Sequence, residues 1–347
     1  MHELAAGITS NNLTYGPVRN PAAPELIAGG SSGGRAAAVA AGVVRFALGT
    51  DNSGSCRIPA ALCGCVGFRP SLDRYPADGL LPLCRTRDTV GVFARSVADL
   101  AIVDAVCADG PTTPETPVPL AGLRLGVPEA HFFEDLESGL EVVIRAALAR
   151  LAGLGVELVR ADVPDVGPLT EAISMPLMAY EAARDIAMYL EGHRAPVRLT
   201  DVVDAVADPR LRGMLQMQLA GRGVRPAQHQ AALGAREALR AAYAACMGFH
   251  RLDALVVPTT RLTARPVGQD ETVSIDGVDV PTLAAFLRNT DPSSCVGLAS
   301  LVLPIGRTHD GLPVGLSIEA LEGSDRRLLQ VGAAIEATLG GPLGGSG

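Results

Sequence analysis

Residues 29–59, GGSSGGRAAAVAAGVVRFALGTDNSGSCRIP, constrain the fold of this chain more than any other stretch. Two clusters of Ser and Gly flank an Ala-rich segment and a short apolar run. Glycine permits backbone conformations that other residues avoid, so both clusters indicate loops. The Ala-rich segment, 35–41, predicts a helix that begins near Gly33, and the apolar run, 43–48, predicts a covered strand. Residues 49–57 would form a second loop at the end of that strand.

A helix that begins at the first loop points unpaired N–H groups toward it, and ligands of open α/β sheets bind where strands end. The two loops can therefore bring Ser31 and Ser55 to a single site. The later pattern of strands alternating with helices favours an α/β fold in which helices cover a sheet. From 169 to 249 the pattern is helical, with breaks near its prolines. Four large side chains there are expected to pack in the core, with a pocket lining as the alternative: Met175, Met178, Tyr180 and Met188.

Other readings of the Gly-rich loop remain open at this point. Residues 29–33 also satisfy the G-x-S-x-G pattern of α/β-hydrolases, with Asp291 and His309 following in the required order. That reading requires Ser31 and His309 to meet, and it leaves little sequence before Ser31 for the preceding strands. A phosphate-binding loop needs a lysine that the sequence does not contain. A purely structural Gly-rich turn is a further alternative.

The motifs GGSSGG, GTDNSGSCRIPAALCG and GFRPS, in this order and at this spacing, resemble the amidase signature family of Ser-Ser-Lys hydrolases. RYPADGLLP, TRDTVG and DGLPVG resemble the branch of indoleacetamide and mandelamide hydrolases. The likeness is specific over 1–107 and 288–339 and thin between them. It implies an α/β fold with a mixed, largely parallel central sheet covered by helices on both faces. It also implies one domain over 1–339, a helical pocket-forming insertion at about 169–249, and a disordered tail at 340–347.

The resemblance also implies the site residues. Ser55 matches the nucleophile that forms an acyl intermediate, and Ser31 matches the bridging serine, which follows a cis peptide bond in the family. The remaining positions are backbone oxyanion donors, at Asn52, Ser53, Gly54 and Ser55, and loop-supporting side chains, at Ser32, Asp51 and Arg57. Ser53 stands where the family usually has a glycine, and its side chain can crowd the acyl pocket.

The third member of the family's triad is a lysine, but all 29 residues counted as Lys or Arg are Arg. A guanidinium does not give up its proton in proteins, so arginine cannot act as the base. We therefore expect little or no amide hydrolysis from this chain as written. Residues 1–21 already resemble an internal segment of the family, which favours a missing N-terminal part that carries the lysine. The alternative is a pseudo-amidase that binds a small amide or a protein partner without turnover.

The remaining expectations come from composition. A net charge of -8 argues against a nucleic-acid partner. No apolar run has the length of a membrane span and no signal peptide is recognisable, so we expect a cytoplasmic protein. The seven cysteines are odd in number and irregularly spaced, which favours free thiols and no metal site. We expect no cofactor, a small-molecule amide as substrate, and an arylacetamide as its favoured type. Apolar surface and strand edges left uncovered by a missing segment predict self-association, including a homodimer.

Overall fold

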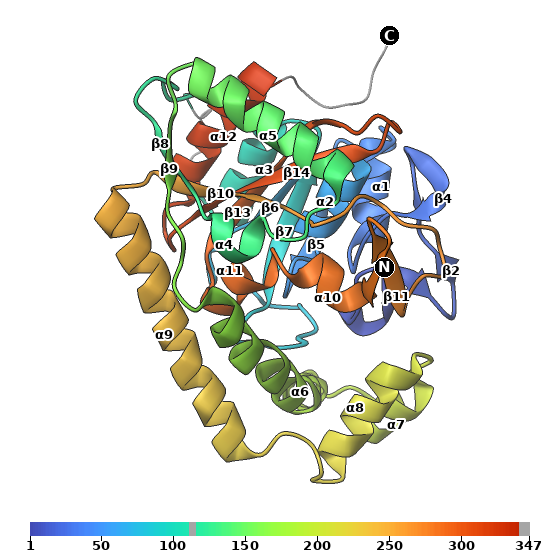
Figure 1. Cartoon of the computed structure of the whole chain (residues 1–347). Helices are drawn as coiled ribbons and strands as arrows, with labels where there is room; N and C mark the ends of the chain where they lie inside the picture. Colours follow the sequence, from blue (N-terminus) through green and yellow to red (C-terminus); the bar gives the residue numbers. More distant parts are fainter. Residues whose placement is uncertain (111–115, 340–347) are drawn as a thin grey trace.

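The computed structural model describes residues 1–110 and 116–339 (Figure 1). Its central strands are β5 (Phe46–Asp51), β6 (Val66–Arg69), β7 (Thr89–Ala94), β8 (Arg124–Val127), β9 (Glu157–Arg160), β10 (Ala254–Pro258), β13 (Ala299–Arg307) and β14 (Pro313–Ala320). They form one 8-stranded sheet in the order β5-β7-β6-β13-β14-β10-β8-β9. Neighbouring strands are antiparallel from β5 through β10, and β10, β8 and β9 run parallel.

The predicted α/β class and the mixed central sheet are confirmed, although the sheet has fewer parallel pairs than predicted. The reason is visible in β13 and β14, because a short turn joins them and a short turn can join only antiparallel strands. Parallel pairing is confined to the part of the sheet where helices lie between consecutive strands.

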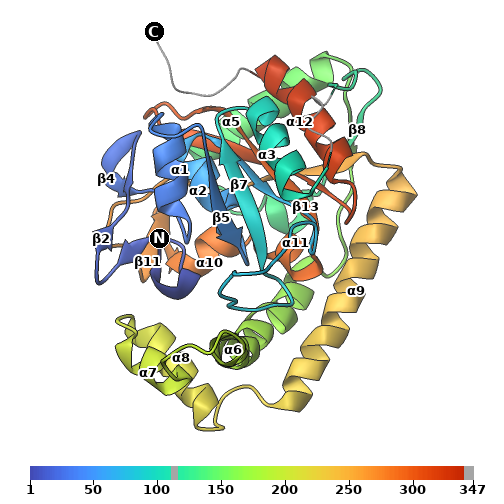
Figure 2. The ribbon, with the colours of Figure 1, turned by 180° about the vertical axis from the view of Figure 1, so that it is seen from behind.

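Helices lie on both faces of the sheet. Those that pack on it or border it are α1 (Gly33–Ala40), α2 (Arg57–Cys63), α3 (Val97–Cys107), α4 (Glu129–Phe132), α5 (Ser138–Gly153), α10 (Thr282–Leu287), α11 (Asp291–Val296) and α12 (Asp325–Leu339). Leu301 of β13 approaches α12, whereas the next residue, Val302, packs with Ala61 of α2. Successive strand residues point to opposite faces, so α2 and α12 cover opposite sides. Figure 2 shows α3 next to α12.

A helical layer lies beyond one end of the sheet in both views (Figures 1 and 2). It consists of α6 (Val166–Gly192), α7 (Leu199–Ala205), α8 (Pro209–Leu219) and α9 (Pro226–His250). The predicted helical pattern with breaks at prolines is confirmed. Pro209 and Pro226 each occupy the first turn of a helix, where a missing N–H costs nothing.

The first 30 residues form short elements beside the central sheet. They are a 3-10 helix, η1 (Glu3–Ala5), and the strands β1 (Asn11–Asn12), β2 (Gly16–Pro17), β3 (Arg19–Asn20) and β4 (Ala23–Ile27). The amide of Ile27 donates to the carbonyl of Arg265 at 2.8 Å, which ties this part to the C-terminal half. A hairpin of β11 (Thr272–Ile275) and β12 (Val278–Pro281) follows Arg265.

The prediction of a covered strand at 43–48 is wrong in position and in burial. The strand is β5, which begins at Phe46, and it forms one edge of the sheet with β7 as its neighbour. Phe46 is therefore 50% exposed, and Val43, Val44 and Leu48 are exposed as well. The opposite edge, β9, instead carries Glu157 and Arg160, which are charges typical of a protected edge.

Several further expectations can be compared with the described residues. The Ser96 hydroxyl caps α3 by accepting a hydrogen bond from the amide of Asp99 at 3.1 Å. All the cysteines are free thiols, as predicted. None of the described helices has both the length and the apolarity needed to cross a membrane. The predicted disordered tail, 340–347, lies outside the described residues.

Candidate active site

The two Ser/Gly loops meet where α1 and α2 begin. The amide of Ser32 donates a hydrogen bond to the carbonyl oxygen of Ser55 at 3.1 Å, so the backbones of the two loops are in direct contact. The Gly30–Ser31 peptide bond is cis, as the family resemblance implied. The structure thus brings together the two segments that carry Ser31 and Ser55.

The hydroxyls of both serines are held in a buried environment. Ser31 is fully buried, and its Oγ has no hydrogen-bond partner among the described residues. Its carbonyl oxygen accepts from the amide of His2 at 3.0 Å and from the hydroxyl of Ser10 at 3.1 Å. Ser55 is also buried, and no hydrogen bond of the described chain joins its hydroxyl to that of Ser31. A buried hydroxyl without a partner is costly, so Ser31 is a candidate for a group that acts on a ligand.

Asp51 organises the loop that carries Ser55. Its fully buried carboxylate accepts hydrogen bonds from the amides of Gly54 at 2.8 Å and Cys56 at 3.1 Å. It also forms ion pairs with Arg57 at 3.0 Å and Arg69 at 3.2 Å. Burial alone would raise the pKa of Asp51, but the two guanidinium groups outweigh it and hold the pKa well below its usual range. The carboxylate is therefore charged at neutral pH, and these contacts fix the conformation of the loop.

The backbone donors of this loop do not all remain available. The Gly54 amide is used by Asp51, which removes it from the four oxyanion donors that the resemblance implied. Gly54 instead has a conformational role: its φ is 129°, and a Cβ at this position would collide with the side chain of Thr290. No described residue accepts a hydrogen bond from the amides of Asn52, Ser53 or Ser55. Those three N–H groups are the remaining free donors of the loop that carries Ser55.

Ser53 is tied to a second buried ion pair that the sequence did not indicate. Its hydroxyl hydrogen-bonds to the guanidinium of Arg87 and donates to Oδ1 of Asn52 at 2.9 Å. Arg87 also donates to the carbonyl oxygen of Asn52 at 3.3 Å and forms an ion pair with Asp291. The Thr290 hydroxyl donates to the Ser53 carbonyl at 2.6 Å. The extra hydroxyl of Ser53 is thus held in this network, and its crowding of the acyl pocket stays a prediction.

Ser32 and Asp88 complete the support of the two loops. The Ser32 hydroxyl donates to the carbonyl of Thr50 and accepts from its amide, both at 3.2 Å, which joins the start of α1 to β5. Asp88 accepts from the side-chain amide of Asn52 at 2.8 Å and from the amide of Cys84 at 2.7 Å. Asp88 therefore links the Asn52 side chain to the backbone of the segment at Cys84.

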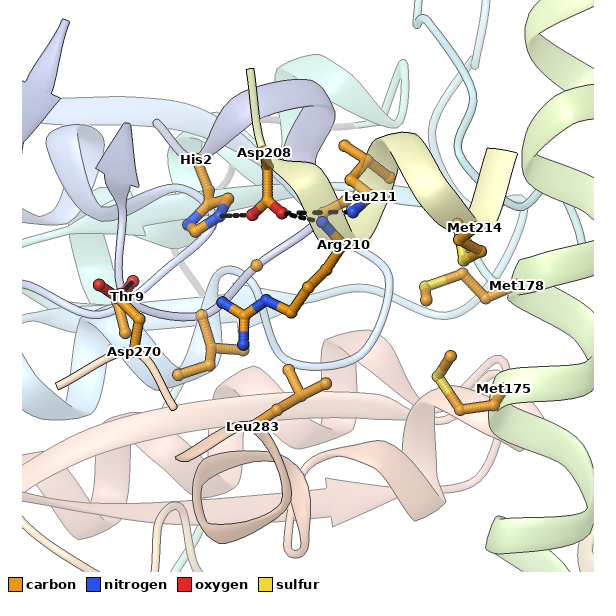
Figure 3. A pocket seen from close by; sticks show the side chains of 13 residues that line it. His2, Thr9, Met175, Met178, Asp208, Arg210, Leu211, Met214, Asp270 and Leu283 are labelled. Carbon is orange, nitrogen blue, oxygen red and sulfur yellow. Dashed lines mark hydrogen bonds and ion pairs between the residues drawn. The ribbon is translucent and has the colours of Figure 1, made fainter. Parts of the chain in front are cut away.

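Two cavities lie between the helical layer and the loops around the site. The larger, about 690 Å³, is lined in part by Ser174 and Asp291, which are both partners of Arg87. The smaller, about 210 Å³, is lined in part by Met178 (Figure 3). Met175 and Leu283 line both cavities. Met175 and Met178 thus line cavities, and their place in the acyl pocket stays a prediction. The core packing expected for Met175 and Met188 is wrong, since both side chains are exposed on α6.

The α/β-hydrolase reading is wrong. His309 is exposed, with 82% of its side chain accessible, and it pairs with Asp310 at 3.0 Å, whereas Ser31 is fully buried. Asp291, the acid of that reading, is the partner of Arg87. In the described ranges, His, Cys, Asp and Glu side chains do not gather in groups of three or more that could hold a metal ion.

The comparisons with known proteins place the chain in a class. It belongs to the amidase family, because the family model described as Amidase matches residues 1–329. It is therefore an enzyme that hydrolyses amides. It is 44% identical over 340 residues to an indoleacetamide hydrolase of Agrobacterium vitis, and the aligned region covers 98% of this chain and 73% of that protein. It is 36% identical over 356 residues to a mandelamide hydrolase of Pseudomonas putida, and the aligned region covers 98% of this chain and 68% of that protein. The predicted family and branch are confirmed.

Solved structures agree with this assignment. A crystal structure of an amidase superimposes with a TM-score of 0.85 at 34% identity, covering 98% of this chain and 73% of the other. The native peptide amidase of Stenotrophomonas maltophilia superimposes with a TM-score of 0.77 at 28% identity, covering 96% and 70%.

Proposed function

We propose that this amidase converts an arylacetamide-type amide to its carboxylic acid and ammonia, with Ser55 as the nucleophile. One observation carries the assignment of the nucleophile. The Ser55 hydroxyl lies on a loop fixed by Asp51, beside the unused amides of Ser53 and Ser55. The hydrolases of indoleacetamide and mandelamide among its relatives support the arylacetamide type.

In the proposed reaction the Ser55 Oγ attacks the amide carbonyl carbon, and its proton passes toward the Ser31 hydroxyl. The amides of Ser53 and Ser55 stabilise the negative charge that develops on the carbonyl oxygen. One such donor contributes about 2.7–4 kcal/mol to the stabilisation of the transition state. Proton transfer to the nitrogen releases ammonia, and water then hydrolyses the acyl-Ser55 ester to regenerate the hydroxyl.

The proton relay requires a base beyond Ser31, and this chain contains no lysine to supply one. Loss of a general base typically slows a reaction by about 10²- to 10⁴-fold. The Ser31 hydroxyl, buried and without a partner, is the place where such a base would act. The absence of a lysine from this chain favours the second candidate, a pseudo-amidase that binds a small amide without turnover.

Further parts of the proposal concern the setting of the reaction. We propose a single domain over 1–339, in which the helices α6 to α9 shape the acyl pocket, and a cytoplasmic location. The β5 edge, with its exposed Phe46 and Leu48, supports self-association of the chain as a homodimer.

The nucleophile can be tested without the missing base. An activated ester such as p-nitrophenyl phenylacetate needs no protonation of its leaving group, so Ser55 can be acylated with less help from a base. We expect a burst of nitrophenolate and, by mass spectrometry, one acyl group on the peptide that carries Ser55. Ser55→Ala should abolish both signals, and Ser274→Ala, at an exposed position of β11, serves as the control that keeps Ser55. Acylation at another residue, or an unchanged burst in Ser55→Ala, would contradict the assignment.

A further inference from the structure

The 690 Å³ cavity is lined by both apolar and polar side chains. Met175 of α6 and Leu287 of α10 are among the apolar ones. The polar ones include His131 of α4, Arg261 in the loop after β10, and Arg288 at the end of α10. A cavity of this size and mixed lining is typical of a small-molecule site. It favours a ligand that has an apolar body and carries a polar group.

This cavity is in contact with the loop that carries Ser55. Two of its lining residues, Ser174 and Asp291, bind the guanidinium of Arg87, which donates to the Ser174 hydroxyl at 3.0 Å and pairs with the Asp291 carboxylate. The same guanidinium hydrogen-bonds to the hydroxyl of Ser53. One side chain therefore touches both the lining of the cavity and the loop of the proposed nucleophile.

Asn289 holds together the segments that carry the polar lining. Its side-chain amide donates to the carbonyl of Phe132 at 2.9 Å and to the carbonyl of Pro258 at 2.8 Å. Phe132 ends α4 and follows His131, and Pro258 ends β10, three residues before Arg261. These two hydrogen bonds bring His131 and Arg261 to the same cavity.

Arg261 has one nitrogen that no described residue binds. Its Nε and Nη2 donate to the carbonyl of Asp135 at 3.2 and 3.1 Å, and Nη2 also pairs with the Asp135 carboxylate at 3.2 Å. Nη1 has no partner in the described chain, and it keeps accessible surface although the residue is only 7% exposed. Because Arg261 lines the cavity, Nη1 is a donor available to a ligand there.

His131 provides an acceptor. Its Nε2 lies 3.1 Å from the carbonyl oxygen of Arg288, which only accepts, so Nε2 carries a hydrogen. Burial lowers the pKa of His131, and the charges of Arg288 and Arg261 lower it too, against the hydrogen bond to that carbonyl and the charge of Glu134. The ring is therefore neutral at neutral pH, and Nδ1 is an acceptor. Nδ1 has no partner among the described residues and keeps accessible surface.

Gly167 leaves the space in front of this acceptor open. A Cβ at Gly167 would lie 3.0 Å from Nδ1 of His131, and Gly167 lines the same cavity. The effect of Arg261 on the pKa of His131 also shows that its guanidinium lies near the ring. The cavity thus offers an open donor and an open acceptor close to each other.

A hydroxyl group satisfies both atoms, because its oxygen accepts and its hydrogen is donated. A carboxylate only accepts, so it would leave the imidazole nitrogen without a partner, and it would share the cavity with the carboxylates of Glu171 and Asp291. An ammonium group only donates, and its charge would oppose that of the guanidinium.

We propose that the 690 Å³ cavity binds the acyl group of the substrate and that Arg261 and His131 select an acyl group carrying a hydroxyl on its ring: Nη1 of Arg261 donates to the hydroxyl oxygen, and Nδ1 of His131 accepts its hydrogen. This inference rests on the proposed function for the link to Ser55. It names the substrate as the amide of a ring-hydroxylated arylacetic acid. A ring without the hydroxyl leaves both atoms without a partner and binds less well.

Binding, rather than turnover, tests the inference. The chain has no Trp, so the fluorescence of an indole ligand can be followed without interference from indole groups of the protein. The ligands are indole-3-acetamide and its 5-hydroxy and 6-hydroxy derivatives, whose hydroxyls lie on the ring edge away from the acetamide. All three are titrated into the Ser55→Ala variant, so that none is consumed. We expect one hydroxylated ligand to bind about tenfold more tightly than indole-3-acetamide.

Two further variants show whether that preference comes from Arg261 and His131. Arg261→Met removes the donor, and Gly167→Ala places a methyl group against Nδ1 while it leaves His131 in place. Each should reduce the preference to a few-fold or less. Gly192→Ala is the matched control for the second change, because Gly192 ends the same helix, α6, with open space around it. Unchanged thermal unfolding shows that each variant is folded.

The outcomes distinguish this inference from the proposed function. If a hydroxylated ligand binds with the predicted preference but the activated ester does not acylate Ser55, the proposed reaction fails and the selection of a hydroxyl stands. If Ser55 is acylated but neither hydroxylated ligand is preferred, the selection fails and the reaction stands. A preference that persists in both Arg261→Met and Gly167→Ala would overturn the inference, as would the absence of binding of all three ligands.

Discussion

Substitution of Asp51 by Asn tests whether the loop that carries Ser55 depends on one buried charge. In the native chain the Asp51 carboxylate faces two fully buried guanidinium groups, those of Arg57 and Arg69. Asparagine retains one acceptor oxygen, enough for the Gly54 amide, but its NH₂ group meets donors where the second oxygen had accepted. Removing one partner of a buried ion pair costs about 3–5 kcal/mol, because the remaining charge is left uncompensated. Typical domains have only about 5–15 kcal/mol of stability.

The assay is urea unfolding followed by circular dichroism, with Glu237→Gln as the control. Glu237 pairs with Arg236 at 3.6 Å and is largely exposed, so its loss should cost less than about 1 kcal/mol. The Asp51 variant should also lose acylation by the activated ester, since the free amides of its loop are no longer fixed. A loss of stability as small as that of the control would refute the reasoning that Asp51 holds the loop.

The unfolding free energies of the native chain and of Asp51→Asn should also depend differently on pH. The pKa of Asp51 is lower in the folded chain than in the unfolded chain. Its contribution is therefore complete above the ordinary carboxyl range and is lost as the pH falls toward the lowered value. The difference in unfolding free energy between the native chain and Asp51→Asn should thus remain constant from neutral pH to about pH 5 and narrow below it. A difference that grows on acidification would have the wrong sign.

Three other outcomes are expected. Hydrolysis of indole-3-acetamide by this chain should be at least about 10²-fold slower than by a lysine-containing relative, measured as ammonia release, and turnover at a relative's rate would contradict the need for a lysine. Gly54→Ala should lower the unfolding free energy by about 2 kcal/mol or more, because of the positive φ and the contact with Thr290, while Gly213→Ala, in open space on α8, should not. Arg87→Gln should slow acylation of Ser55 more than it weakens binding of indole-3-acetamide, because Arg87 touches the oxyanion loop; equal effects would argue against that role.

The local parts of the fold could be read from the sequence, because their causes are local. Glycines and serines flanking an Ala-rich segment define the α1 region, and Ser96 caps α3 through a contact three residues away. The edge position of β5 could not be read in the same way. A short apolar run such as 43–48 is equally compatible with a central strand, and its exposure depends on which strands pair with it.

The same distinction holds for the site. Ser31 and Ser55 lie in motifs and were found from them, whereas the partner of Arg87 is Asp291, far along the chain, and no spacing rule connects the two. The His2–Asp208 pair likewise joins the first residues to the start of α8.

Met175 and Leu283 belong to the walls of both cavities, so the partition between these spaces consists partly of side-chain atoms. A thioether chain changes rotamer more readily than a backbone segment moves. If the two cavities form the proposed acyl pocket, rotation of these side chains would set the largest acyl group that fits, and an elongated amide could extend from the smaller cavity into the larger one without any shift of α6.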